Sequence, residues 1–144
     1  MREGLSWIGI FRLGLVQTAL GSVVILTTST LNRVMVVELA LPAMIPGFLV
    51  SLHYAVQMSR PRLGYGSDIG GRRTPWIIGG ILTLGVGATG ASAATMLMAV
   101  HPTWGFMLSL IAFLLIGIGV GAAGTSLLVL LAKLVDGRRK PAAA

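Results

Sequence analysis

The 144-residue chain contains no cysteine, so disulfide bonds, thiolate metal sites and iron–sulfur clusters are excluded at once. Charge is scarce as well, because Asp, Glu, Lys and Arg together make up only 10% of the residues. The four acidic residues form no obvious carboxylate dyad, and no nucleophile is paired with a base. The sequence therefore predicts that the protein is not an enzyme and that it has no metal site built from its own side chains.

In place of charge the chain has long apolar segments, and hydrophobic residues make up 55% of it. Three runs contain no charged residue, at 13–32, 39–59 and 74–132. A helix needs about 20 apolar residues to span a bilayer, so the first two runs hold one span each. The third run holds two, because His101-Pro102 interrupts it near the middle. We therefore predict an all-α polytopic membrane protein with four transmembrane helices, at 13–33, 41–59, 75–99 and 103–133.

The net charge of +7 is distributed as in a membrane protein and not as in a nucleic-acid-binding protein. With the N-terminus in the cytoplasm, ten of the eleven Lys and Arg residues are cytoplasmic, Arg33 being the exception. This positive-inside pattern predicts that both termini are cytoplasmic and that the lipid bilayer is the partner. For residues 1–12 a short helix on the membrane surface and a disordered tail both remain open. The expected parts are a cytoplasmic segment 1–12, a transmembrane domain 13–133 with a cytoplasmic loop 60–74, and a basic cytoplasmic tail 134–144.

The loop between the second and third predicted helices holds one acid and two adjacent bases among glycines. The pattern fits a charged turn between membrane helices, where glycine lets the backbone turn tightly. Its spacing, G-x-x-x-D-x-x-G-R-R, also resembles motif A of the major facilitator superfamily, although Ile69 and Gly66 depart from the usual motif. That resemblance implies a chain corresponding to the first third of a major facilitator bundle, with a cytoplasmic latch. The implied latch residues are Gly64, Asp68, Gly71, Arg72 and Arg73.

Two segments, 12–43 and 65–80, resemble a narrower branch of that superfamily, the PucC- and LhaA-like proteins that deliver bacteriochlorophyll. The resemblance implies an assembly factor for light-harvesting or reaction-centre complexes in the bacterial inner (intracytoplasmic) membrane. It implies bacteriochlorophyll as the bound pigment, and subunits of those complexes, or a missing C-terminal part of the same protein, as partners. Two other functions remain open: a small structural membrane subunit of a pigment–protein complex, and a fragment of a secondary transporter for a small solute.

Polar residues in and beside the first predicted span are candidate functional groups. Gln17 and Asn32 satisfy their side-chain amides less easily within a helix than Ser and Thr satisfy their hydroxyls. We therefore expect both to face protein or a cavity. Arg33 and Glu38 are the only charges on the far side, and either a local ion pair or an external gate would account for them.

The second predicted span contains His53, seven residues before Arg60 and so roughly 10 Å inside the membrane from that charge. His53 is a candidate ligand for the magnesium of a chlorin ring, or a neutral histidine hydrogen-bonded to a neighbouring helix. The last two predicted spans are rich in glycine, which allows close helix packing or provides a face for a flat ligand. The glycines that we expect at helix contacts are Gly87, Gly90, Gly117 and Gly121.

Overall fold

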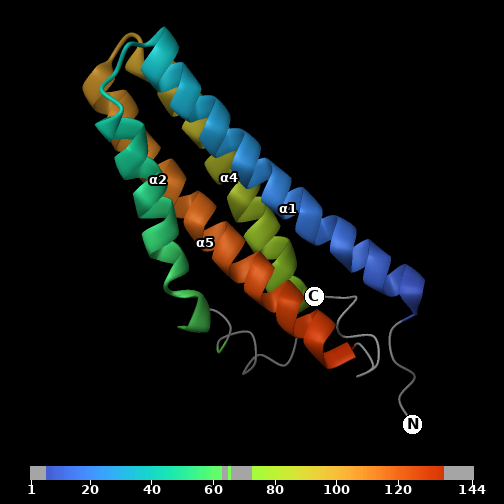
Figure 1. The fold of residues 1–144 in the computed structure, drawn as a ribbon. Coiled ribbons are helices and arrows are strands. Elements are labelled where there is room, and N and C mark those ends of the chain that lie inside the picture. The colour runs from blue at the N-terminus through green and yellow to red at the C-terminus, as the bar shows by residue number, and fades with distance from the viewer. Residues whose placement is uncertain (1–5, 63–64, 66–72, 135–144) are drawn as a thin grey trace.

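The chain is helical almost throughout the residues that the structure, a computed structural model, describes: 6–62, 65 and 73–134 (Figure 1). The helices run up and down, so that each lies roughly along the same axis as its neighbours (Figure 1). In chain order the elements are α1 (Trp7–Arg33), the π-helix η1 (Val34–Glu38), α2 (Met44–Gln57), α4 (Thr74–Met98) and α5 (Pro102–Leu134).

Helix α1 begins earlier than the sequence analysis predicts. Ser6 is its N-cap residue, and the Ser6 hydroxyl accepts a hydrogen bond from the backbone N–H of Gly9 at 3.2 Å. A capping hydroxyl satisfies one of the four N–H groups that a helix start leaves free, so the helix forms from Trp7 onward. Residues 7–12 are therefore helical and continuous with α1, which argues against a disordered tail there. Their position on the membrane surface stays a prediction, and residues 1–5 lie outside the described part.

The far end of α1 widens into η1 before the chain turns. The backbone N–H of Leu39 bonds to the carbonyl of Val34 at 3.0 Å, five residues back, as a π-helix requires. Ala40 then takes a φ of 50°, in the left-handed region that commonly ends a helix. The reversal places the start of α2 beside the end of α1 (Figure 1).

Helix α2 is shorter than the predicted span 41–59, and this prediction is wrong in length. Its 14 residues give about 21 Å of helix, less than the roughly 30 Å thickness of the hydrocarbon layer. Prolines account for both ends. Pro46 lies in the first turn, where its missing N–H costs nothing, whereas Pro61 removes a donor and crowds the carbonyl of Gln57. The chain turns at Met58, whose N–H bonds to Ala55 at 3.1 Å.

Three other stretches in the described part are long and apolar enough to cross a membrane: Trp7–Glu38, Thr74–Met98 and Pro102–Lys133. The predicted break at His101-Pro102 is confirmed, since α4 ends at Met98 and α5 begins at Pro102. The prediction of an all-α membrane protein with four helices is thus confirmed for the described residues. Three of the four helices are long enough to be full membrane spans, and α2 is not.

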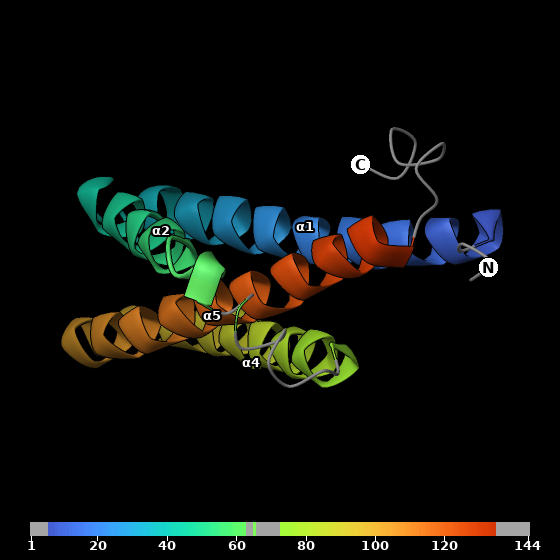
Figure 2. The same ribbon diagram turned by 90° about the horizontal axis from the view of Figure 1, so that it is seen from below.

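Helix α5 is the centre of the arrangement. Figure 2 shows it between α1 and α2 on one side and α4 on the other. The buried share of the most apolar stretch is 50% in α5, 28% in α4 and 11% in α1. Helix α1 therefore crosses the α4–α5 pair with most of its surface uncovered, whereas α4 and α5 form a tightly packed antiparallel hairpin.

Candidate functional site

Three polar side chains on α2 and the turn after it form a continuous chain of hydrogen bonds. The Nη2 group of Arg60 donates to Oε1 of Gln57. The side-chain amide nitrogen of Gln57 lies 2.7 Å from Nε2 of His53. Residues three and four apart on a helix lie on the same face, so the spacing brings the three together. We call His53, Gln57 and Arg60 the α2 polar ladder.

The ladder fixes the proton of His53. Since Oε1 of Gln57 accepts from Arg60, its amide group must point at His53 and donate to Nε2. A neutral imidazole with an accepting Nε2 carries its proton on Nδ1. The Nδ1 atom is buried and has no hydrogen-bond partner among the residues that the structure describes.

His53 also lies where α2 and α5 approach most closely. Its side chain is 0% exposed, and its backbone oxygen would lie 2.9 Å from a Cβ atom added at Gly117. Because Gln57 occupies Nε2 and the packing covers Nδ1, no macrocycle can approach either nitrogen in this arrangement. The hydrogen-bond partner is on the same helix and not on a neighbouring one, and a ligand role for His53 stays a prediction.

Replacing His53 by leucine is expected to destabilise the protein by about 1–3 kcal/mol, because the buried amide of Gln57 loses its acceptor. Unfolding in mild detergent, followed by circular dichroism, measures this loss. Phe48→Leu is the matched control, since Phe48 lies on the same helix and is 53% exposed. If His53→Leu instead removed a pigment band and left stability unchanged, His53 would be a magnesium ligand and the buried-ladder interpretation would be wrong.

Most of the predicted cytoplasmic latch lies outside the described residues, namely Gly64, Asp68, Gly71 and Arg72. Arg73 is described and is the N-cap residue of α4, with a partly buried side chain. Pro75 follows in the first turn of α4, where its fixed φ suits a helix start.

The polar residues of the first span do not form one site. Gln17 is partly buried, and its Oε1 atom has no partner within the described part of the chain. Asn32, Arg33 and Glu38 are exposed at the opposite end of α1. No ion pair joins Arg33 and Glu38 among the described residues, in contrast to the predicted local pair.

The four selected glycines all lie at buried or partly buried positions. A Cβ atom at Gly87 would lie 2.8 Å from the backbone nitrogen of Ile116, and one at Gly90 would lie 3.7 Å from Cβ of Ala112. Gly117 faces α2, as described above, and Gly121 is buried. These glycine positions adjoin other helices, so they leave no open face for a flat ligand.

The sequence analysis did not single out the glycines with the closest approach. A Cβ atom added at Gly119 would lie 2.5 Å from the backbone nitrogen of Leu84. One added at Gly80 would lie 2.7 Å from the carbonyl oxygen of Gly119. The sequence did contain a signal for Gly80: small and apolar residues recur along α4 at intervals of three and four residues, which places them on one face of the helix. The buried positions on that face are Ile77, Gly80, Leu84, Gly87, Ala91, Ala94 and Met98.

An apolar hollow of about 310 Å³ lies between α1 and α4. Gly85 forms part of its wall, and a Cβ atom added there would meet nothing within 4 Å. We call this hollow the α1–α4 groove. Its lining residues are aliphatic or glycine: Val16, Ala19, Leu20, Val23, Ile81, Leu84 and Gly85. Such a surface suits a large apolar ligand and not a charged one.

Within the described residues, no group of three His, Cys, Asp or Glu side chains could hold a metal ion. Hollows of about 420 Å³ beside Trp7 and about 340 Å³ beside Trp76 are also present. The polar ladder and the α1–α4 groove differ in their chemistry. One is a hydrogen-bonding cluster with a cation, and the other is apolar.

Comparison with known proteins places the chain among membrane proteins of purple bacteria. It is 56% identical over 142 residues to a Rhodobacter capsulatus protein named "Bacteriochlorophyll synthase 44.5 kDa chain", covering 97% of this chain and 33% of that protein. It is 35% identical to "Protein PucC" of Cereibacter sphaeroides, covering 92% of this chain and 31% of the relative. It is 33% identical to "Protein PucC" of Rhodovulum sulfidophilum, covering 96% of this chain and 33% of that relative.

The chain thus spans about a third of the length of these curated relatives. No solved structure matches it. The family described as PUCC protein matches residues 30–144, from the end of α1 onward. Because this match includes α2, α4 and α5 and most of the chain, the protein belongs to the PUCC family.

Proposed function

We propose that this protein serves in the assembly of photosynthetic light-harvesting or reaction-centre complexes, where it handles or delivers bacteriochlorophyll. The observation that carries the proposal is the 56% identity, over nearly the whole chain, to a relative whose name refers to bacteriochlorophyll. The proposed role is to carry the pigment and not to synthesise it. The chain spans only about a third of the length of these relatives, so the proposal concerns the activity of a protein of the relatives' kind as a whole.

The described helices favour a pigment site at the edge of the bundle. Gly80 and Gly87 on α4 and Gly117 and Gly119 on α5 are occupied by helix packing, and His53 is buried. The α1–α4 groove is open, apolar and flanked by a helix that is mostly uncovered. We propose that one face of the pigment ring lies on this groove, held by contact with aliphatic side chains.

The proposed orientation is with both ends of the chain in the cytoplasm, in the bacterial inner (intracytoplasmic) membrane. Cysteine labelling can test it directly, because the chain has no cysteine of its own. A thiol introduced by Leu39→Cys should react with a membrane-impermeant reagent in intact cells, and one introduced by Tyr65→Cys should not. Labelling at residue 65 from outside would reverse the orientation.

The function itself is tested by extraction of the protein in mild detergent from a bacteriochlorophyll-producing host. We expect the purified protein, or its complex, to retain pigment that absorbs in the near infrared. An equal amount of pigment in a mock purification from cells without the protein would show that the pigment is carried over non-specifically. If no pigment is retained, the protein is a structural membrane subunit and the pigment-handling proposal fails.

A further inference from the structure

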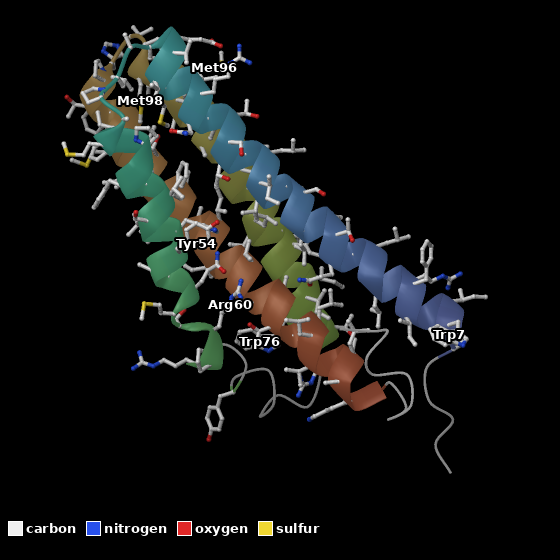
Figure 3. The ribbon with its side chains drawn as sticks, viewed as in Figure 1. Trp7, Tyr54, Arg60, Trp76, Met96 and Met98 are labelled. Atoms are coloured by element: carbon white, nitrogen blue, oxygen red, sulfur yellow. The ribbon has the colours of Figure 1, made fainter. Side chains whose placement is uncertain are left out.

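The side chain of Arg60 folds back along α2. Its Nη2 group bonds to Gln57, three residues back, so the guanidinium lies alongside the last turn of α2 and not beyond it. Long basic side chains at helix ends usually reach toward the headgroups. Figure 3 shows Arg60 beside the end of α2, on the flank toward α5.

The charge of Arg60 has no acidic counterion among the described residues. The only acidic side chain there is Glu38, at the opposite end of α1 (Figure 1). The Nε atom of Arg60 is buried and has no hydrogen-bond partner in the part of the chain that the structure describes. A partly buried cation without a counterion is unfavourable, so an anionic group is expected to complete the site.

The ladder holds the guanidinium ready for such a group. Gln57 fixes one end of it, and Gln57 is itself held by the buried ring of His53. The planar fork of an arginine matches the oxygens of a phosphate, and a fork that is already oriented loses less freedom on binding. Gln57 and His53 act as positioning residues, and Arg60 makes the contact.

The location favours a lipid as the source of the phosphate. Residue 60 follows the C-terminal end of α2, at the predicted cytoplasmic end of the second span, and Met58 beside it is 83% exposed. Tyr54, one turn before Met58, is also exposed, so the face of α2 next to the ladder is uncovered in the described part. We propose that Arg60, oriented by Gln57 and His53, binds the phosphate of one anionic phospholipid at the end of α2. This site is independent of the pigment role.

The test measures the thermal unfolding midpoint of the purified full chain in mixed micelles of detergent and lipid. Phosphatidylglycerol should raise the midpoint of the wild type by a few degrees, and the net-neutral phosphatidylcholine should raise it less. Arg60→Gln should abolish the difference between the two lipids. Arg62→Gln is the matched control, because Arg62 is a nearby exposed arginine on the same segment and should keep the full difference.

Two further variants keep the test decisive if Arg60→Gln does not fold. Arg60→Lys retains the charge without the fork and should keep only part of the lipid difference, whereas Gln57→Leu should weaken it by releasing the guanidinium. The phosphorus content of the purified protein should fall by one phosphate per chain in Arg60→Gln and by less in Arg60→Lys, but not in Arg62→Gln.

An unchanged lipid difference in both Arg60 variants would overturn the proposal. Inorganic phosphate at matched concentration separates the two sources of the group. An equal rise with inorganic phosphate would overturn the assignment to a lipid, and no rise would support it.

Discussion

Replacing Gly119 by alanine is expected to destabilise the protein by about 1–3 kcal/mol, the usual cost of forcing an extra methyl group into a packed interior. The added Cβ would lie 2.5 Å from the backbone nitrogen of Leu84 and 2.7 Å from the carbonyl of Gly80. Both atoms belong to a helix backbone and cannot rotate away, so α4 and α5 must separate. In a membrane, close packing of backbones supplies much of the association between helices, which makes this separation costly.

Gly124→Ala is the matched control on the same helix. Gly124 is buried, but a Cβ atom there would meet nothing within 4 Å. This substitution should be neutral, or stabilising by up to about 1 kcal/mol, because alanine favours the helix. Denaturant or thermal unfolding of both variants in one detergent gives the comparison. Equal stability of the two variants would mean that α4 and α5 do not meet at Gly119.

Replacing Gly85 by leucine is expected to reduce the retained bacteriochlorophyll by roughly tenfold or more, a loss equivalent to about 1.4 kcal/mol of binding. The new side chain would extend into the α1–α4 groove, where the ring is proposed to lie. Folding should not suffer, because nothing lies within 4 Å of the added Cβ and leucine favours a helix more than glycine does. The ratio of near-infrared to protein absorbance of the purified variants measures the effect.

Gly47→Leu controls for the general effect of adding a large side chain to an exposed glycine. Gly47 lies on α2, away from the groove, and its Cβ position is equally open. It should retain pigment at the wild-type level. If Gly85→Leu and Gly47→Leu bind the same amount of pigment as the wild type, the ring lies elsewhere even though the protein handles pigment. This outcome differs from a complete absence of pigment, which contradicts the function.

Local features of the sequence were sufficient to predict the last two helices. The run without charge from residue 74 to residue 132 requires helices in a membrane, since each backbone group must find a partner within its own segment. Pro75 lies in the first turn of α4, and Pro102 begins α5 after the break at His101. Proline restricts its own φ and removes its own N–H, so its effect is local and visible in the sequence.

The start of α1 was also encoded locally, in the hydroxyl of Ser6, but its charged flank at Arg12 suggested a later beginning. The length of α2 was overestimated because apolar composition alone does not show where prolines stop the hydrogen-bond pattern. Pro61 follows four residues after Gln57, the last residue of α2, and it was this spacing that decided the end.

Only the tertiary structure decided which groups meet. The sequence placed His53 inside the membrane, but its burial depends on how α2 packs against Gly117 of α5. The choice among twenty glycines depends in the same way on the register of α4 against α5, which brings Gly119 and not Gly124 against a backbone. Sequence by itself determined the helices, because their hydrogen bonds are internal to each segment. The groove, the buried histidine and the close glycine contacts depend on positions between segments, and these are set by side-chain packing.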